Sequence, residues 1–316
     1  MFEFFGPFDM EFPPNMDGAL FMTVLYQEGA ARCPKCGSMS LEMIGKNRVR
    51  CKNCGAVLKK ELKPSDISRL IELMKDGDKK VKIGASAILA NLTSDNIDEA
   101  LMHLDEIIDL LDSDQHQVRA NLTGLLGRIA EDDPAKVVEA APKLIRLLYD
   151  QYQDVRDNAA ASLMYISKDY SEKILSCVDR VVEIIKEEDT KNRFNHVGLL
   201  ASISREHPEE IKPYKDLFIK LLDSDEKPII YNSLHALFQL TKAYPEIAMS
   251  NIDNFKKMLS SDDPRIRQDI SAVIALLAKK KPEFVKEKVK QDLMERLNDS
   301  NEFVKENVQE ALGHLS

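Results

Sequence analysis

The chain has 316 residues, of which 44% are hydrophobic and 31% charged, and its formal net charge at pH 7 is -9. This is an ordinary composition for a soluble globular protein, and the acidic balance argues against a protein that coats nucleic acid or membranes nonspecifically. The charge is uneven: residues 1–29 carry -5, residues 30–60 carry +7 and residues 61–316 carry -11. We therefore expect an acidic tail, a basic mini-domain and an acidic body with these boundaries.

The tail, residues 1–29, contains seven of the chain's 20 aromatic residues. It is too short to form a core, and its prolines disfavour a helix. Two interpretations remain open: an extended Phe-rich segment that docks on this chain or on a partner, and a disordered tail. No basic residue precedes Arg32, so a secretory signal is not expected. We expect a cytoplasmic protein without a membrane partner.

The mini-domain, residues 30–60, contains two Cys-x-x-Cys pairs separated by 14 residues, namely Cys33, Cys36, Cys51 and Cys54. Four thiolates suit a tetrahedral Zn²⁺ ion, and a glycine after each second cysteine allows the tight turn that such a pair needs. Short strands are expected on either side of Gly45 and after Cys54. The region resembles a zinc ribbon, and the sequence predicts one structural zinc with no coordination position open for catalysis.

Basic residues lie on the expected hairpin of this ribbon: Lys46, Arg48 and Arg50. They could contact the phosphates of DNA or RNA. Alternatively, they form a solvated basic face that docks on an acidic partner, including the acidic body of the same chain. The absence of aromatic residues for base stacking favours the second interpretation.

The body, residues 61–316, shows an apolar position that recurs every 37 or 38 residues. From each of these positions, further apolar residues follow at offsets of 8 and 11, which share one face of a helix. A second amphipathic helix precedes each one, and Pro142 and Pro213 predict kinks in two of these first helices. Short acidic linkers between the paired helices offer N-cap oxygens. The recurring positions are Val81, Val118, Val155, Asn192 (the one polar exception), Ile229, Ile266 and Val304.

Helix pairs at this period, with short acidic turns followed by Val-Arg, resemble HEAT repeats, in particular the compact kind also seen in phycobilisome-lyase-like proteins. The resemblance implies an all-α fold: a right-handed α-solenoid of about seven HEAT-like helix pairs, preceded by the small β zinc ribbon. Asn192 stands at an apolar position, and Ile230 stands where other repeats have a base. We expect looser stacking at both repeats.

Two polar columns flank the apolar stripe. One residue after the recurring position most repeats have a base, such as Arg119 or Arg267, and three residues after it stand Asn121, Asn158, Asn195 and Asn232. In one interpretation the bases pair with acidic turns and the asparagines join neighbouring repeats. In the other, the asparagines hold the backbone of an extended peptide, because an amide both donates and accepts.

Second helices line the concave side of HEAT-like stacks, which places Phe194, Tyr231 and Phe238 on a groove. An exposed apolar patch of this kind marks an interaction site. The alternative is that curvature of the stack buries the strip.

No catalytic pattern stands out, and Cys177 lies in an apolar helix where a core role is expected. We therefore expect a non-catalytic scaffold whose groove binds a protein segment, with residues 1–29 as one candidate segment. The alternative is a transcription or translation factor whose ribbon contacts nucleic acid.

Overall fold

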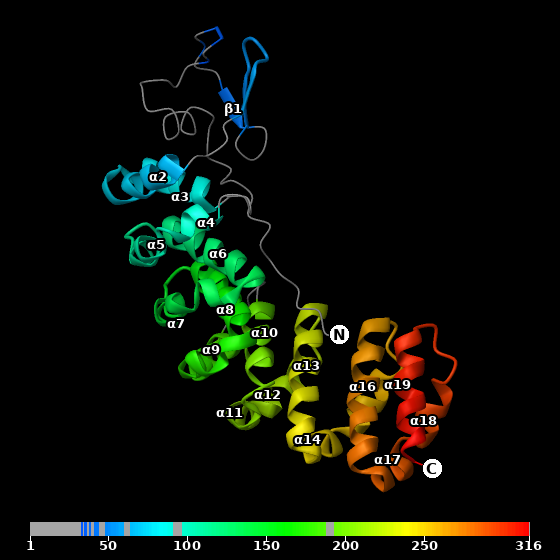
Figure 1. Cartoon of the computed structure of the whole chain (residues 1–316). Coiled ribbons are helices and arrows are strands. Elements are labelled where there is room, and N and C mark those ends of the chain that lie inside the picture. The colour runs from blue at the N-terminus through cyan, green and yellow to red at the C-terminus, as the bar shows by residue number, and fades with distance from the viewer. Residues whose placement is uncertain are drawn as a thin grey trace. The chain divides into compact units, whose positions relative to one another are not determined.

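The computed structural model describes residues 33, 35–36, 38, 41–43, 48–59, 64–90, 97–187 and 193–315 (Figure 1). The predicted tail, Lys46 and Asn192 lie outside these residues. The chain divides into two compact units between Asp169 and Tyr170. Each unit is described on its own.

The first unit begins with a small antiparallel sheet. Its strands pair in sequence order, with Leu41 opposite Cys51 and Arg50 opposite Val57. This is the predicted hairpin with its third strand, and it brings the end of one strand to the turn that carries the second cysteine pair. The strands are β1 (Leu41–Met43), β2 (Arg48–Cys51) and β3 (Val57–Lys59).

Helix pairs make up the rest of the first unit. α2 packs on α3, α3 packs on α6, and α5 packs on α6. Two 3-10 turns, Pro134–Lys136 and Val138–Ala140, connect α6 to α7. The helices are α2 (Pro64–Asp76), α3 (Lys79–Ala90), α4 (Ile97–Leu101), α5 (Leu104–Leu110), α6 (His116–Asp132), α7 (Ala141–Leu147) and α8 (Gln153–Tyr170).

The second unit continues the same pattern. Four of its helices, α10, α13, α16 and α19, pack in succession as one layer, and Figure 1 shows the last three side by side. The helices are α9 (Val178–Glu187), α10 (Arg193–Ile203), α11 (Pro208–Ile211), α12 (Lys215–Leu221), α13 (Lys227–Ala243), α14 (Pro245–Ser250), α15 (Ile252–Met258), α16 (Pro264–Lys280), α17 (Pro282–Lys288), α18 (Lys290–Glu295) and α19 (Glu302–Gly313).

The apolar columns predicted from the period form the core. Leu126, Leu163, Leu200 and Leu237, at offset 8 in successive repeats, are fully buried. Burial of one such side chain contributes about 2 kcal/mol. The fold is therefore an all-α repeat solenoid with very little sheet, as predicted.

The first helix of a pair is less regular than the sequence predicted. The helix expected over 209–222 is broken near its predicted kink, and the helices expected to be continuous over 246–259 and 283–297 are also broken into shorter segments. Pro213 explains one break, because it lacks the N–H of a helical hydrogen bond. At another break Asn251 Nδ2 donates to the carbonyl of Ile247 at 2.8 Å, which satisfies the end of α14.

The acidic linkers cap only some second helices. Asp263 accepts hydrogen bonds from the N–H groups of Arg265 and Ile266, and Asn301 caps α19 in the same way. At α6 and α13 the prediction of an acidic cap was wrong. Ser113 and Ser224 instead accept from the backbone two residues later, which places Gln115 and Glu226 at the N-cap without a side-chain bond.

Candidate functional site

The four cysteines of the ribbon converge. The Sγ atoms of Cys33, Cys36, Cys51 and Cys54 all lie within 4.8 Å of one another. Two of the separations, Cys33 to Cys54 and Cys36 to Cys51, are 3.6 Å. Four sulfurs around a tetrahedral zinc, each about 2.3 Å from the ion, lie roughly 3.8 Å apart. The cluster therefore has the donor set and the spacing of a four-cysteine metal site.

Backbone turns position these sulfurs. Gly55 has φ +70°, a conformation that glycine adopts without strain, and its N–H donates to the carbonyl of Cys51 at 2.8 Å. At the other pair, Cys33 N donates to Ser38 O at 2.7 Å. The turns thus direct the two cysteines of each pair toward one point. The positive φ of Gly55 is the conformation that the tight turn after the second cysteine was expected to need.

Hydrogen bonds to sulfur favour the thiolate form. The Asn53 side chain donates to Cys36 Sγ at 3.5 Å, and this bond, with the backbone N–H of Ser38, lowers the pKa of Cys36 to about 6. The backbone N–H of Cys54 holds the pKa of Cys51 below its usual value. Burial and the neighbouring sulfurs raise the pKa of Cys54 to about 12. A thiolate is the form that binds metal, so the surroundings prepare Cys36 and Cys51 for metal binding.

The basic face of the ribbon is partly neutralised. Arg50 lies 3.7 Å from Glu42 across the β1–β2 pair, and Lys52 lies 3.6 Å from the same carboxylate. Both basic side chains stay about half exposed. Arg48 lies on β2, while Lys46 lies outside the described residues. The nucleic-acid contact of these three residues stays a prediction.

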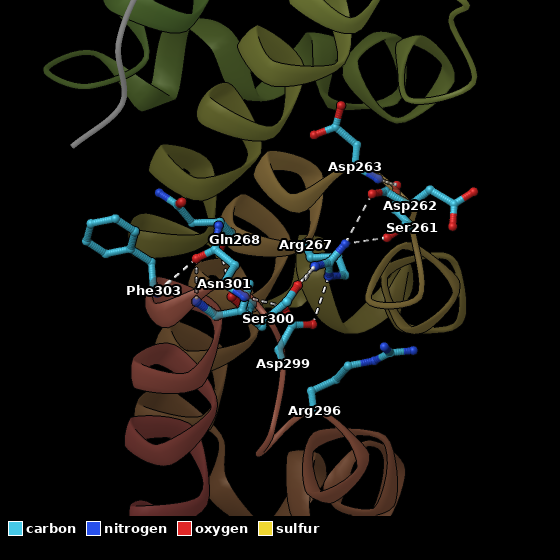
Figure 2. A network of polar contacts seen from close by, with 12 residues as sticks. Ser261, Asp262, Asp263, Arg267, Gln268, Arg296, Asp299, Ser300, Asn301 and Phe303 are labelled. Carbon is cyan, nitrogen blue, oxygen red and sulfur yellow. Dashed lines mark hydrogen bonds and ion pairs between the residues drawn. The ribbon is translucent and has the colours of Figure 1, made fainter.

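The recurring arginine column of the repeats forms contacts inside the stack. Arg119 donates from Nε and Nη2 to both oxygens of Asp150, at 2.6 and 2.9 Å, and from Nη1 to the carbonyl of Ser113 at 2.7 Å. Arg267 does the same with Asp299 and Ser261, with all three distances 2.8 Å (Figure 2). Each guanidinium therefore joins its own turn to the turn of the next repeat.

The asparagine column also joins repeats. The Nδ2 of Asn158 donates to Ala120 O at 3.0 Å, and that of Asn232 to Phe194 O at 2.8 Å. Asn121 donates to Ser86 Oγ at 2.9 Å. Asn195 is buried. These are the inter-repeat contacts that the sequence analysis set against peptide binding, and a peptide contact of the same side chains stays a prediction.

The predicted groove strip is mostly buried. Among its aromatic members, Tyr231 is 8% exposed, while Phe194 and Phe238 are half-buried. The Tyr231 hydroxyl donates to Asp263 at 2.9 Å, and the guanidinium of Arg265 lies 4.4 Å from the centre of its ring. Lys242 Nζ lies 4.8 Å from the centre of the Phe238 ring. Two aromatic rings of α13 therefore each carry a cation, one from α13 itself and one from the start of α16.

Polar residues that the sequence did not single out lie on the same helices. His235 and Gln239 are buried and share a hydrogen bond of 2.9 Å, and burial lowers the pKa of His235 to about 4. Asp269 on α16 is buried, which raises its pKa to about 7. The sequence shows where each of these residues stands relative to the recurring position of its repeat. It does not show that their side chains are buried. Cys177 is fully buried, which raises its thiol pKa to about 12 and fits the predicted core role.

No family model matches this chain, and no curated protein matches it. Solved structures of helical repeat proteins do match. An engineered protein is 20% identical with a TM-score of 0.69, over 80% of this chain and 71% of its own. A computationally designed armadillo repeat protein for modular peptide recognition is 22% identical with a TM-score of 0.59, over 67% of this chain and all of its own. The chain is thus a helical repeat solenoid similar to armadillo-type stacks.

No helix within the described parts of the chain combines the length and the apolar character needed to cross a bilayer.

Proposed function

We propose that this protein is a non-catalytic adaptor that holds an extended protein segment against the second-helix layer of its HEAT-type repeats. The observation that carries the proposal is the surface formed by α10, α13 and the start of α16. Phe194 and Phe238 are half-buried rather than core residues, and Lys242 and Arg265 lie over the rings of Phe238 and Tyr231. Aromatic rings combined with cations are enriched at protein interfaces. The designed armadillo structure, made for modular peptide recognition, supports this use of the fold.

We further propose that the four-cysteine cluster holds one structural zinc and that residues 30–60 are a zinc ribbon. The 3.6 Å sulfur separations and the Asn53 hydrogen bond support this assignment. The metal would tie the β1–β2 hairpin to the turn after β2, and four cysteine ligands would complete its coordination. We place the protein in the cytoplasm, where cysteines stay reduced and available to metal.

Peptide selection tests the adaptor. The full chain is used to select from a displayed library of random 12-residue peptides, and the enriched peptides are measured by calorimetry. We expect binding that depends weakly on salt and weakens at least tenfold in the double variant Phe194→Ser, Phe238→Ser. Phe303→Ser is the matched control, because Phe303 is 58% exposed and lies at the start of α19.

Two outcomes contradict the adaptor proposal. One is equal weakening of peptide binding by Phe303→Ser, which would indicate nonspecific apolar adhesion. The other is steeply salt-dependent binding of a random-sequence DNA or RNA oligonucleotide together with no enriched peptide, which would favour a nucleic-acid factor.

A further inference from the structure

A cavity of about 570 Å³ lies in the second unit, between the end of α9, the start of α10 and the turn from α12 to α13. Three cationic side chains line it, Lys186, Arg193 and Lys220, together with turn residues 223–226. No residue of this cavity took part in the groove described above. Its composition is best understood by comparison with the other repeats.

Arg193 occupies the column of Arg119 and Arg267. In those two repeats the guanidinium forms a fork with the carboxylate of Asp150 or Asp299, 31 or 32 residues later, and a third bond to a carbonyl six residues earlier. Figure 2 shows this arrangement around Arg267. A buried guanidinium therefore has a carboxylate partner in both cases.

The carboxylate is missing at the fourth repeat. Asp150 and Asp299 stand five residues before the next recurring position, and Ser224 occupies that place here; its Oγ accepts from the backbone N–H of Glu226 at 3.1 Å. Asp225, 32 residues after Arg193, lines the cavity and is exposed. Arg193 Nε is buried and has no hydrogen-bond partner among the residues that the structure describes. A buried donor of a charged group that has no partner is destabilising, because its lost hydration is not replaced.

The neighbouring repeat shows that a missing partner is otherwise replaced. Ile230 stands in the same column and cannot form an ion pair. There Tyr231 and Lys227 reach Asp263 of the next turn instead, at 2.9 and 2.6 Å. No comparable bond to Arg193 Nε comes from the turn 223–226 in the described structure, where Asp223 and Asp225 line the cavity and are exposed.

We propose that this cavity binds a carboxylate from a second molecule, which takes the place that Asp150 and Asp299 fill in the other repeats. The Arg193 fork matches the two oxygens of a carboxylate, and the N-terminus of α10 favours an anion beside it. Asp223, Asp225 and Glu226 surround the cavity and disfavour a phosphate dianion. The carboxylate comes from a free organic acid or from an Asp or Glu side chain of a protein.

The test uses the full chain and two probes that each carry a single carboxylate, sodium propionate and the blocked tripeptide N-acetyl-Gly-Asp-Gly-amide. NMR follows the Arg193 Nε–H and the Ser224 amide at constant ionic strength. We expect saturable shifts with a dissociation constant on the order of 1–10 mM, the strength that two charge-assisted hydrogen bonds supply. The tighter probe identifies the source. No saturable shift with either probe overturns the proposal.

Variants give an independent readout. Ser224→Asp supplies the missing carboxylate within the chain, so it should raise the melting temperature and abolish the shifts of the Arg193 Nε–H. Arg193→Gln should abolish the Ser224 shifts, whereas Lys215→Gln, on the exposed start of α12, should leave them unchanged. If Asp223→Asn and Asp225→Asn together lower the melting temperature as much as Arg193→Gln, the arginine already has a partner and the proposal fails.

Discussion

The turns of neighbouring repeats are joined by an arginine fork, in which one guanidinium binds both oxygens of an aspartate in the next turn. Arg267 is 10% and Asp299 3% exposed at the side chain, so their ion pair is shielded from water and fixed by a third bond to Ser261. Removing one member of a buried pair leaves the other charge without compensation. The fork therefore stabilises the position of each repeat against the next.

The fork yields the first prediction. Asp299→Asn should lower the free energy of unfolding by about 2–4 kcal/mol, because the charge of Arg267 stays buried. Urea denaturation measures this loss. Asp292→Asn, which breaks the more exposed pair with Lys256, should cost about 0.5 kcal/mol or less. Equal effects of the two variants would contradict a special role for the fork.

The same pair predicts a pH effect. The hydrogen bonds from Arg267 hold the pKa of Asp299 below its usual value. The stabilising contribution is therefore complete above the usual pKa of an aspartate, about 4, and disappears as the pH falls through the lower, folded-state pKa. As the pH falls through that range, the free energy of unfolding should decrease less in Asp299→Asn than in the wild type, because the variant has no carboxylate to protonate.

The cysteine cluster yields a prediction of metal content. The wild-type chain, purified without added metal, should carry one zinc per chain, and Cys33→Ser should carry at least tenfold less, because a three-sulfur site binds weakly. Cys177→Ala is the matched control, since this buried cysteine lies outside the cluster and should leave the zinc content unchanged. Mass spectrometry of the metal decides between these outcomes.

At the scale of elements, the period of 37 residues predicted which helices exist and which residues form the core. Leu126, Leu163 and Leu200 are buried as expected, since an apolar position that recurs on one helix face has to pack against a neighbouring element. The breaks in the first helices were missed where no proline marks them. They depend on local hydrogen bonds, such as the one from Asn251, that the apolar pattern does not encode.

The asparagine column shows where sequence reasoning left two interpretations open. An amide at offset 3 fits a peptide backbone and a neighbouring repeat equally well, and only the packing distance decides. Asn158 and Asn232 donate to carbonyls of the preceding repeat, so at least one amide hydrogen of each is used inside the stack. The four-cysteine cluster, by contrast, was predictable because the spacing of two Cys-x-x-Cys pairs is typical of a metal site.

Asp269, three residues after Ile266, stands in the same column as these asparagines and yields a further prediction. Its pKa is raised to about 7 by burial, so the folded state keeps its proton between about pH 4 and 7 while the unfolded state releases it. The free energy of unfolding should therefore fall as the pH rises from about 4 to 7, and this carboxyl should cause no further decrease above pH 7. Asp269→Asn should stabilise the protein at pH 8 by roughly 2–4 kcal/mol and flatten this profile. An unchanged profile in urea denaturation at pH 5 and pH 8 would contradict the buried carboxyl.

At the scale of the whole molecule, the ribbon and the helices depend on different forces. Each helical unit has its own core of buried apolar side chains, whereas a segment as short as residues 30–60 has too little chain to build a core of that size. A strong chelator should therefore unfold the ribbon and leave the helices intact. Circular dichroism at 222 nm should change little, while amide exchange across residues 41–59 should accelerate. Loss of helical signal on chelation would contradict independent stability.

The central claim is that the second-helix layer of residues 193–243 binds a protein segment. Hydrogen exchange of the full chain, with and without a peptide enriched by selection, tests it most directly. The account predicts slower exchange in α10 and α13 around Phe194, Tyr231 and Phe238, with little change in the ribbon. Protection confined to residues 33–59, or no protection anywhere at a saturating peptide concentration, would contradict it.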